Sequence, residues 1–360
     1  MQTKRTAVIT LNTLNNFFIK NLYTYIIDGI GNIRNNKKTV VDIAIFLFCG
    51  KIIEMINPIY KFLAWKTRQD FGRSDKKRDA GQTTPADVIR FDNIVYGDDS
   101  QFPKWQLLDV YRPRSAGTDN LEKLPVIISV HGGAWVYGDK DVYQWYCLRL
   151  AQSGFAVVNF SYRLTPEVPF PAPVEDTEKV FQWVSANAAQ YGFDLNNVFA
   201  VGDSAGAHIL ALYTSAITNP SYAENYPFIK PKAFKLSGVA LNCGKYDMNP
   251  ELETTPHMGI LVKALLNGQI TKEGLDLINA SAHVTKDFPP AFVMTCKGDF
   301  QFKQAPFIIK AFEAAGVQHE YHCYGTDEQP LWHVFHCDGR LPQAKVCNDD
   351  ECNFFRSLIK

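Results

Sequence analysis

The segment VFAVGDSAGAHIL, Val198–Leu210, is the most informative part of this chain for its fold class. An apolar run ends at Gly202, a serine follows between small residues, and a second apolar stretch begins at once. This pattern predicts a strand, a tight turn and a helix, with Ser204 strained at the apex of the turn. Gly202 and Gly206 have no Cβ, so the strand and the helix can approach closely. Such a turn exposes the Ser204 hydroxyl, and the helix N-terminus behind it favours negative charge, as a nucleophile requires.

Strand and helix patterns alternate on both sides of this turn. Strands are predicted within 105–113, 124–133, 155–164, 197–202, 235–244, 290–299 and 319–325. Helices are predicted within 141–154, 173–192, 205–218 and 303–316, with a last one after 349. This alternation is typical of an α/β fold with a mostly parallel, wound sheet and helices on both faces. Sites in such sheets gather at the carboxyl ends of the strands.

The chain divides by composition into an N-terminal segment and a catalytic domain. Residues 1–88 are predicted to be a helical cap segment, rich in Ile, Phe and Tyr up to about residue 66, followed by a charge-dense polar linker over 66–88. Residues 89–360 are the predicted catalytic domain, with the α/β alternation described above. An insert at 248–288 has helical stretches of its own and is predicted to be part of a helical cap.

Composition excludes several partners. Lys+Arg and Asp+Glu are equal at 37 each, so there is no electrostatic case for nucleic acid or an anionic membrane surface. The eight cysteines are irregularly spaced, which indicates free thiols in a reducing, cytoplasmic setting. No signal peptide is predicted, and charges interrupt the most apolar segment, 40–65, so stable membrane insertion is not expected. The oligomeric state stays open.

A loop that follows the buried strand at 124–130 carries a second signal. Acyl transfer needs N–H donors aimed at the developing oxyanion, and residues without large side chains let a loop turn its amides inward. Gly132, Gly133 and Ala134 lie in this loop, and Ala205 follows the serine. Their amides are the predicted oxyanion hole, while His131 is predicted to anchor the loop.

A serine nucleophile needs a base, and the base needs an orienting acid, in the chain order Ser, Asp, His. Asp299 ends a predicted strand at the edge where the site is expected, with Asp247 as the alternative acid. His333 lies in a loop beyond the last strand and is the predicted base, with His336 as the alternative.

Four motifs together resemble the hormone-sensitive-lipase-like branch of the α/β-hydrolase esterases. They are HGGAW (131–135), YRLTPEVPFPAPVED (162–176), GDSAG (202–206) and HVF (333–335), and the likeness runs from about residue 105 to the C-terminus. The resemblance implies Ser204 as nucleophile, Asp299 as acid and His333 as base, with the loop amides and Ala205 as oxyanion hole. It also implies that Arg163, Pro166 and Glu167 are scaffold residues.

Two positions depart from that family pattern. Ala134 stands where a third glycine is frequent, and Ala207 stands where a glycine often follows Gly206. Neither change removes a catalytic group, although Ala207 is expected to narrow the pocket.

These features predict a serine hydrolase that cleaves small carboxylic esters, with short-chain acyl or aryl groups, through an acyl-enzyme. No metal or organic cofactor is expected. Aromatic residues near the motifs are candidates for an acyl or aryl pocket: Trp135, Tyr137, Trp145 and Tyr146. The alternatives are a catalytically weak homologue that binds a small molecule, and an amidase or a deacetylase of acetylated carbohydrate. A zinc site among His319, His322, Cys323, His333, His336 and Cys337 is disfavoured because no paired C-x-x-C spacing occurs.

Overall fold

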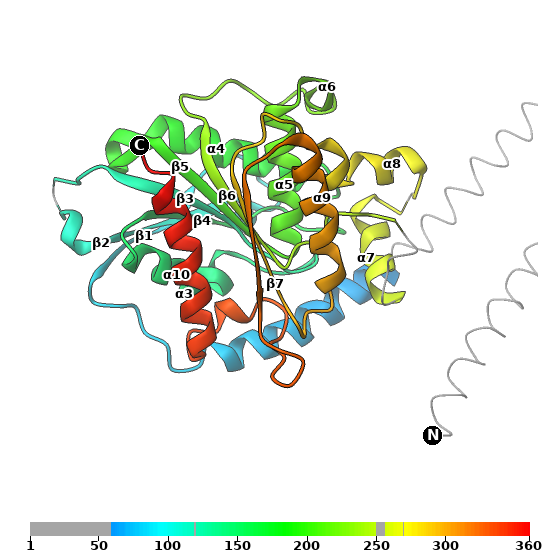
Figure 1. The fold of residues 1–360 in the computed structure, drawn as a ribbon, viewed down its shortest axis with the longest axis horizontal. Coiled ribbons are helices and arrows are strands. Elements are labelled where there is room, and N and C mark those ends of the chain that lie inside the picture. The colour runs from blue at the N-terminus through cyan, green and yellow to red at the C-terminus, as the bar shows by residue number, and fades with distance from the viewer. Residues whose placement is uncertain (1–58, 119, 250–255, 269) are drawn as a thin grey trace, which may run out of the picture. The chain divides into compact units, whose positions relative to one another are not determined.

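An eight-stranded sheet forms the centre of the structure, a computed structural model that describes residues 59–118, 120–249, 256–268 and 270–360 (Figure 1). Its strands are β1 (Val88–Val95), β2 (Leu107–Pro113), β3 (Leu124–Val130), β4 (Ala156–Phe160), β5 (Phe193–Asp203), β6 (Leu236–Asn242), β7 (Ala291–Cys296) and β8 (His319–Tyr324). The spatial order is β1-β2-β4-β3-β5-β6-β7-β8. The β1–β2 and β2–β4 pairs are antiparallel, and the pairs from β4 to β8 are parallel. The prediction of a mostly parallel wound sheet is confirmed.

Helices cover both faces of the sheet. They are α3 (Lys140–Gln152), α4 (Ala172–Tyr191), α5 (Ala205–Thr218), α6 (Pro220–Ala223), α7 (Pro256–Leu265), α8 (Lys272–Leu277), α9 (Ala305–Ala315) and α10 (Pro342–Ser357). One core joins α4, α5 and α9 to the sheet, and a second core joins α3 and α10 to its other face. Ile128 belongs to the first core and its neighbour Ile127 to the second, because successive strand side chains point to opposite faces. The continuous apolar run of β3 therefore reflects burial on both sides.

The predicted helix signals are present at α4. A proline stands in its first turn together with Glu175, and Gly192 follows its last residue with φ +61°. Glycine adopts this left-handed conformation easily because it has no Cβ, so it commonly follows the last residue of a helix. The Gly192 amide donates to the Ala188 carbonyl oxygen and closes the helix.

The predicted linker at 66–88 is wrong for much of its length. Residues 59–78 form one helix, and β1 begins at Val88, a strand that the sequence pattern did not predict. The charges that suggested a linker pair along the helix surface, as Lys66 with Asp70 at 2.6 Å and Arg73 with Asp70 at 3.8 Å. Such i,i+4 and i,i+3 pairs support a solvent-facing helix.

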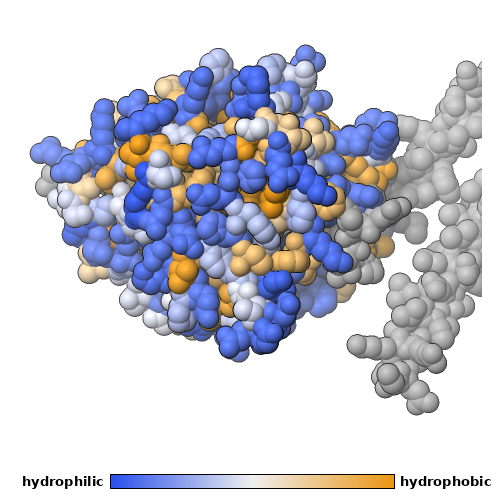
Figure 2. All heavy atoms as spheres, viewed as in Figure 1, coloured by the Kyte–Doolittle hydropathy of each residue, from blue (hydrophilic) through white to orange (hydrophobic). Residues whose placement is uncertain are grey.

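The helical insert at 248–288 has helices in its described part, namely α7, α8 and a 3-10 turn at Ala280–His283. The cap segment predicted within residues 1–58 lies outside the described residues. Among the described helices, none is long and apolar enough to cross a bilayer. Figure 2 shows hydrophilic side chains over most of the visible face, with hydrophobic ones in small groups between them.

Candidate active site

The predicted site residues meet at one edge of the sheet. Ser204 directly follows β5, and the loop 131–138 follows β3. Asp299 lies three residues after the end of β7, and His333 lies in the loop after β8. Because β3, β5, β7 and β8 run parallel, their carboxyl ends share this edge.

Ser204, His333 and Asp299 form one continuous chain of hydrogen bonds. The Ser204 Oγ atom lies 2.8 Å from His333 Nε2. On the other side of the ring, His333 Nδ1 lies 2.7 Å from Asp299 Oδ1. An ionised carboxylate can only accept, so Nδ1 carries the proton and Nε2 presents a lone pair to the serine hydroxyl. The structure thus brings together the three residues that the sequence predicted, in the arrangement that a serine nucleophile needs.

Asp299 is held ionised by its surroundings. Burial would raise its pKa, but the charge and hydrogen bond of His333, the Gln301 amide and the Cys243 side chain together keep the pKa below its usual value. The Gln301 N–H donates to Asp299 Oδ1 at 2.7 Å, and the Thr295 hydroxyl donates to Oδ2 at 3.1 Å. A buried, multiply bonded carboxylate of this kind can hold the imidazole in one orientation and one tautomer.

The turn at Ser204 is strained as the sequence predicted. Ser204 has φ +55° and ψ −113°, a region that residues with a Cβ rarely adopt. Its amide donates to the Asn242 carbonyl oxygen at the end of β6, at 2.8 Å. A Cβ added to Gly202 would collide with the Gly206 carbonyl group, and one added to Gly206 would overlap the carbonyl oxygen of Val130. Both glycines are therefore required by close backbone approach.

Gly206→Ala is expected to destabilise the fold by about 3 kcal/mol or more, because the new methyl group meets rigid backbone that cannot move aside cheaply. The matched control is Gly259→Ala in α7, where an added Cβ meets no atom within 4 Å. That control should be neutral or slightly stabilising, since alanine favours a helix over glycine. Urea unfolding followed by circular dichroism measures both variants, and an equal stability for the two would contradict the close approach.

The predicted oxyanion loop lies against the serine. A Cβ on Gly132 would come within 2.7 Å of the Asp203 carbonyl oxygen and within 3.3 Å of the Ser204 Cβ. Gly133 has φ +122°, and Ala134 has φ +52°. Ala134 therefore adopts a positive φ even though it stands where the family pattern often has glycine. Ala205 is the first residue of α5, so its amide has no acceptor within the helix and is available to a ligand.

His131 anchors this loop, as predicted. Its ring is fully buried, stacks on Tyr162 at a centroid distance of 4.0 Å, and has Nδ1 2.8 Å from the Gly132 carbonyl oxygen. Burial lowers the pKa of His131 to about 4, so the ring is neutral at physiological pH.

The two alternative residues have other partners. Asp247 accepts a hydrogen bond from the Asn249 amide at 2.8 Å. His336 lies with Nε2 2.7 Å from Asp203 Oδ1, and both side chains are 0% exposed. Because these two side chains are engaged elsewhere and the hydrogen bonds of Ser204 and His333 lead to Asp299, the geometry favours Asp299 and His333 as the acid and the base.

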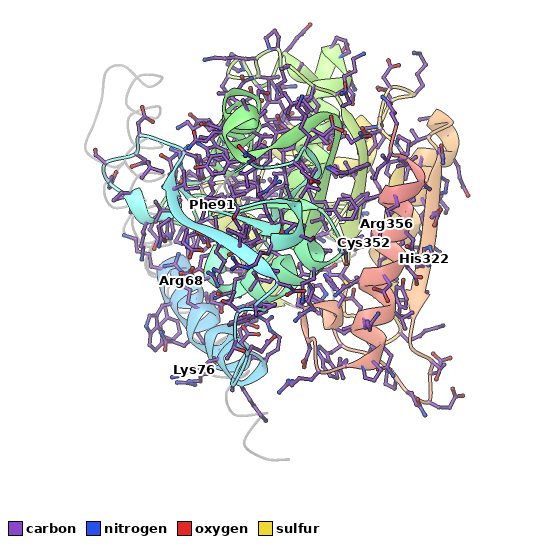
Figure 3. All side chains as sticks on the ribbon, turned by 90° about the vertical axis from the view of Figure 1, so that its left-hand side faces the viewer. Arg68, Lys76, Phe91, His322, Cys352 and Arg356 are labelled. Atoms are coloured by element: carbon purple, nitrogen blue, oxygen red, sulfur yellow. The ribbon has the colours of Figure 1, made fainter. Side chains whose placement is uncertain are left out.

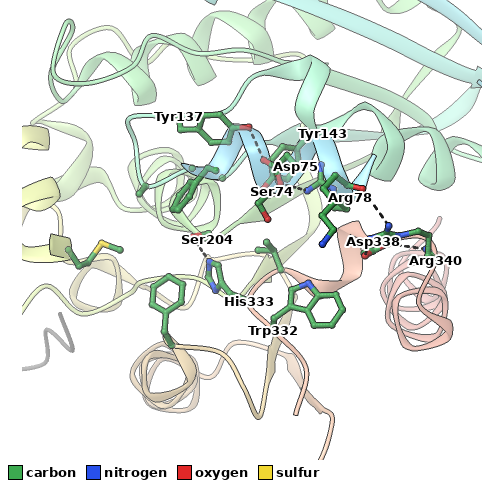
Figure 4. A pocket seen from close by; sticks show the side chains of 18 residues that line it. Ser74, Asp75, Arg78, Tyr137, Tyr143, Ser204, Trp332, His333, Asp338 and Arg340 are labelled. Carbon is green, nitrogen blue, oxygen red and sulfur yellow. Dashed lines mark hydrogen bonds and ion pairs between the residues drawn. The ribbon is translucent and has the colours of Figure 1, made fainter. Parts of the chain in front are cut away.

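A cavity of about 440 Å³ opens in front of Ser204 (Figure 4). Its lining joins the helix 59–78, the oxyanion loop, α7 and the loop that carries His333: Phe71, Ser74, Asp75, Lys77, Arg78, Gly132, Gly133, Ala134, Tyr137, Tyr143, Ser204, Met258, Phe300, Trp332, His333, Val334, Asp338 and Arg340. Of the four aromatic residues predicted for the pocket, only Tyr137 lines it. Four other aromatic side chains line the cavity: Phe71, Tyr143, Phe300 and Trp332. The sequence did not predict these four as lining residues, because only the fold brings their segments together.

The remaining three aromatic candidates pack elsewhere. The Trp135 indole donates to His208 Nδ1 at 3.1 Å, and His208 Nε2 lies 2.8 Å from the Ile278 carbonyl oxygen. Burial lowers the pKa of His208 to about 4. Tyr146 is buried edge-on against His336, and Trp145 packs at the margin of the second core.

The scaffold role implied for the segment after β4 has a geometric basis. Arg163 pairs with the buried Asp176 of α4 at 2.8 Å. Glu167 forms a double hydrogen bond with Arg68, with both distances 2.7 Å. Arg68, labelled in Figure 3, lies on the helix 59–78 and also donates to the Val136 carbonyl oxygen at 2.7 Å. Arg68 therefore joins the helix 59–78 to the loop 131–138.

Two described groups have a donor set that could hold a metal ion. They are Asp203 with His336 and Cys337, and Cys243 with Asp299 and His333. The second group includes Asp299 and His333, the two residues hydrogen-bonded to each other beside Ser204. His322, which the sequence placed among zinc candidates, lies on β8 beside α10 and pairs with Glu320 at 3.1 Å (Figure 3).

Comparison with known proteins identifies a family and several relatives of this chain. Residues 108–305, more than half of the chain, match the BD-FAE family. Versiconal hemiacetal acetate esterase from Dothistroma septosporum is 27% identical over 237 residues, which cover 62% of this chain and 70% of that protein. Esterase LipC from Mycobacterium tuberculosis is 30% identical over 208 residues, which cover 56% of this chain and about half (49%) of LipC.

The fold has a close counterpart among solved structures. Esterase B from Lactobacillus rhamnosis superimposes with a TM-score of 0.73 and 27% identity, covering 83% of this chain and 95% of that one. That esterase has also been solved with a tributyrin phosphonate inhibitor. The chain therefore belongs to the BD-FAE family, and it is a carboxylic ester hydrolase with the α/β-hydrolase fold.

Proposed function

We propose that Ser204, His333 and Asp299 are the catalytic triad of a serine hydrolase that cleaves small carboxylic esters through an acyl-enzyme. The observation that carries this proposal is the unbroken hydrogen-bond chain from Ser204 Oγ through the His333 ring to Asp299, with distances of 2.8 and 2.7 Å.

In the first step, His333 Nε2 accepts the Ser204 proton while Oγ attacks the acyl carbon and forms a tetrahedral intermediate. Asp299 stays ionised and stabilises the imidazolium that results. The intermediate collapses when Nε2–H gives the proton to the alcohol oxygen, so the C–O bond to the alcohol breaks and the acyl group remains on Ser204.

In the second step, His333 accepts a proton from water, and the hydroxide attacks the acyl carbon. The Ser204 Oγ atom then takes the proton back from Nε2, and the carboxylic acid leaves. Both steps use the same three side chains and need no electron transfer, so atoms and charges balance with water as the only co-substrate.

The oxyanion of both intermediates would be held by backbone amides. The amides of Gly133, Ala134 and Ala205 are the proposed donors, and Gly132 lets the loop lie against the serine. Removing one such donor typically costs about 3 kcal/mol of transition-state stabilisation. The support is the close approach of the loop to Ser204 and the positive φ angles of Gly133 and Ala134.

The substrate class follows from the cavity. A volume of about 440 Å³ suits a small ligand, and the aromatic walls can pack against acyl or aryl groups. The names of the relatives point the same way, since one is an acetate esterase and another was captured with a tributyrin phosphonate. Short-chain acyl or aryl esters are therefore the proposed substrates.

We propose that a helical cap covers this cavity. The helix 59–78 contributes Phe71, Ser74 and Arg78 to the lining, and Met258 of α7 adds a contact from the insert. Thr67 on this helix lies 3.0 Å from His257 Nε2 of α7, so the two parts of the cap are joined. The cap thus comprises the helix 59–78 together with the described helices of the insert.

Arg68→Ala is expected to raise KM by about three- to tenfold with a smaller change in kcat. The substitution removes the hydrogen bonds that hold the cap helix to Glu167 and Val136 while leaving the triad untouched. Steady-state kinetics on p-nitrophenyl butyrate measure the effect. Lys66→Ala, which removes only a surface ion pair on the same helix, is the matched control and should match wild type. Equal KM values for both variants would show that Arg68 does not position the cap.

The substrate proposal is tested with an ester panel. Acetate, butyrate and octanoate esters of p-nitrophenol vary the acyl group, phenyl acetate varies the alcohol, and p-nitroacetanilide and acetylated xylan probe the amide and carbohydrate alternatives. The highest kcat/KM is expected for acetate or butyrate. Faster turnover of the anilide or of the acetylated xylan would replace the ester proposal, and saturable binding without any turnover would favour the binding-protein alternative.

We also propose a reducing, cytoplasmic location. The seven described cysteines are all free thiols, and six of them are buried. Free buried thiols are typical of proteins from reducing compartments.

A further inference from the structure

A second aspartate–histidine pair lies directly behind the nucleophile. Asp203 is the residue before Ser204, and its Oδ1 atom lies 2.7 Å from His336 Nε2. Both side chains are 0% exposed. Their other polar atoms, Asp203 Oδ2 and His336 Nδ1, have no protein hydrogen-bond partner among the described residues. Each side chain is therefore the main polar partner that compensates for burial of the other, and His336 Nε2 also lies 3.7 Å from Cys337 Sγ.

This pair connects two segments that are far apart in sequence. Asp203 ends β5 and shares the strained turn with Ser204. His336 lies three residues after His333, in a 3-10 turn whose amides bond backward, from Phe335 to Trp332 and from Cys337 to Val334. A short, hydrogen-bonded stretch of backbone therefore connects His336 to His333.

Surrounding side chains hold the pair from the opposite side. The Tyr146 ring packs edge-on against the His336 ring at a centroid distance of 4.9 Å. The Tyr146 hydroxyl donates to Glu351 at 2.6 Å, and the Asn242 amide group donates to the other Glu351 oxygen at 2.8 Å. The Asn242 carbonyl oxygen in turn accepts the Ser204 amide. The pair thus packs, through the Tyr146 ring, against a buried polar network that also reaches the backbone of Ser204.

We infer that Asp203 and His336 are positioning residues for the proposed reaction: their buried ion pair ties the nucleophile turn to the loop of the base and sets the distance between Ser204 Oγ and His333 Nε2. Neither touches the reacting atoms. The inference rests on the proposed triad. It gives a role to His336, the second histidine in the loop of His333, and to its partner Asp203, the residue before Ser204.

Positioning of this kind has a specific kinetic signature. A displacement of about 1 Å between reacting groups can lower a rate by about a hundredfold. The cavity that binds the ester is lined by neither Asp203 nor His336. Loss of the pair should therefore lower kcat and leave KM nearly unchanged.

The test replaces His336 in graded steps. His336→Phe keeps a ring but removes the donor, and kcat on p-nitrophenyl butyrate should fall by about ten- to a hundredfold with KM within about twofold of wild type. His336→Gln keeps an N–H donor that can reach Asp203 and should recover kcat to within about threefold of wild type. If His336→Phe is recovered only unfolded, His336→Asn, whose amide is too short to reach Asp203, takes its place with the same expected loss.

A matched control separates positioning from stability. Glu178 and Lys232 form another ion pair of 2.7 Å, with side chains 4% and 6% exposed, outside the cavity lining. Glu178→Gln should lower the melting temperature without a change in kcat. A comparable kcat loss in this control, or a wild-type kcat in the folded Phe or Asn variant, would overturn the inference.

Metal content and wild-type activity give two further decisive results. Zinc bound stoichiometrically to the purified wild type and lost from His336→Phe would overturn the ion pair in favour of a metal site made with Cys337. An inactive wild type would refute the proposed function itself, whereas an active wild type with unaffected His336 variants would refute only the positioning role.

Discussion

Ser204→Ala is expected to lower kcat for ester hydrolysis by about 10⁵-fold or more while the protein stays folded. The substitution removes the only protein atom that bonds to the acyl carbon in the proposed mechanism, and comparable losses are found when a serine nucleophile is deleted elsewhere. The measurement is p-nitrophenyl acetate hydrolysis at matched protein concentration, with circular dichroism as a check on folding.

The control for this variant is Ser237→Ala, which removes an exposed hydroxyl that donates to the Asn196 carbonyl oxygen, away from the cavity. It should keep the wild-type rate. Residual activity of Ser204→Ala within about tenfold of wild type would show that another group attacks the ester.

Asp299→Asn is expected to lower kcat by about 10³- to 10⁴-fold with little change in KM. An amide at this position can donate to His333 Nδ1, which favours the tautomer whose Nε2 carries the proton and so cannot accept the serine proton. The negative charge that stabilises the imidazolium is lost as well. Steady-state kinetics on p-nitrophenyl butyrate separate the two constants.

Asp247→Asn is the matched control because Asp247 was the alternative acid from the sequence. Its carboxylate bonds to the Asn249 amide, and this variant should have near wild-type kcat. If the two variants exchanged their effects, the acid would be Asp247 and the hydrogen bond between Asp299 and His333 would be incidental.

The sheet could be predicted because its signals are local. Val198–Leu210 contains the strand, the turn and the start of the helix in thirteen consecutive letters, and the steric need for Gly202 and Gly206 follows from geometry that every such turn shares. The continuous apolar run of β3 likewise indicates that this strand is buried on both faces of the sheet. By contrast, β1 was missed because an edge strand pairs on one side only and keeps exposed polar residues.

The part of the helix 59–78 that lies beyond about residue 66 was missed for a different reason. Its charge-dense sequence resembles a linker. Tertiary contacts make it part of the site, because Arg68 bonds to Glu167 and Val136, roughly 70 to 100 residues away in sequence. Periodicity within the helix carries no information about those partners. The walls that Phe71 and Trp332 give to the cavity were unpredictable for the same reason.

The base loop shows how far residue types alone can lead. The chemistry of a serine hydrolase requires a histidine, and both His333 and His336 satisfied that requirement in the sequence. The sequence favoured His333 through its HVF motif, and the folded arrangement shows the two partners, since His333 faces Ser204 and His336 faces Asp203. The catalytic roles assigned to Ser204, Asp299 and His333 stay predictions that kinetics must test.

Covalent labelling tests the identity of the nucleophile most directly. Wild-type protein treated with a p-nitrophenyl alkylphosphonate, digested and analysed by mass spectrometry should carry one phosphonyl group, on Ser204, in step with loss of esterase activity. Ser204→Ala should remain unlabelled, and Asp299→Asn should be labelled much more slowly. Stoichiometric labelling of a different residue, or full esterase activity in protein whose Ser204 is completely modified, would contradict the proposed mechanism.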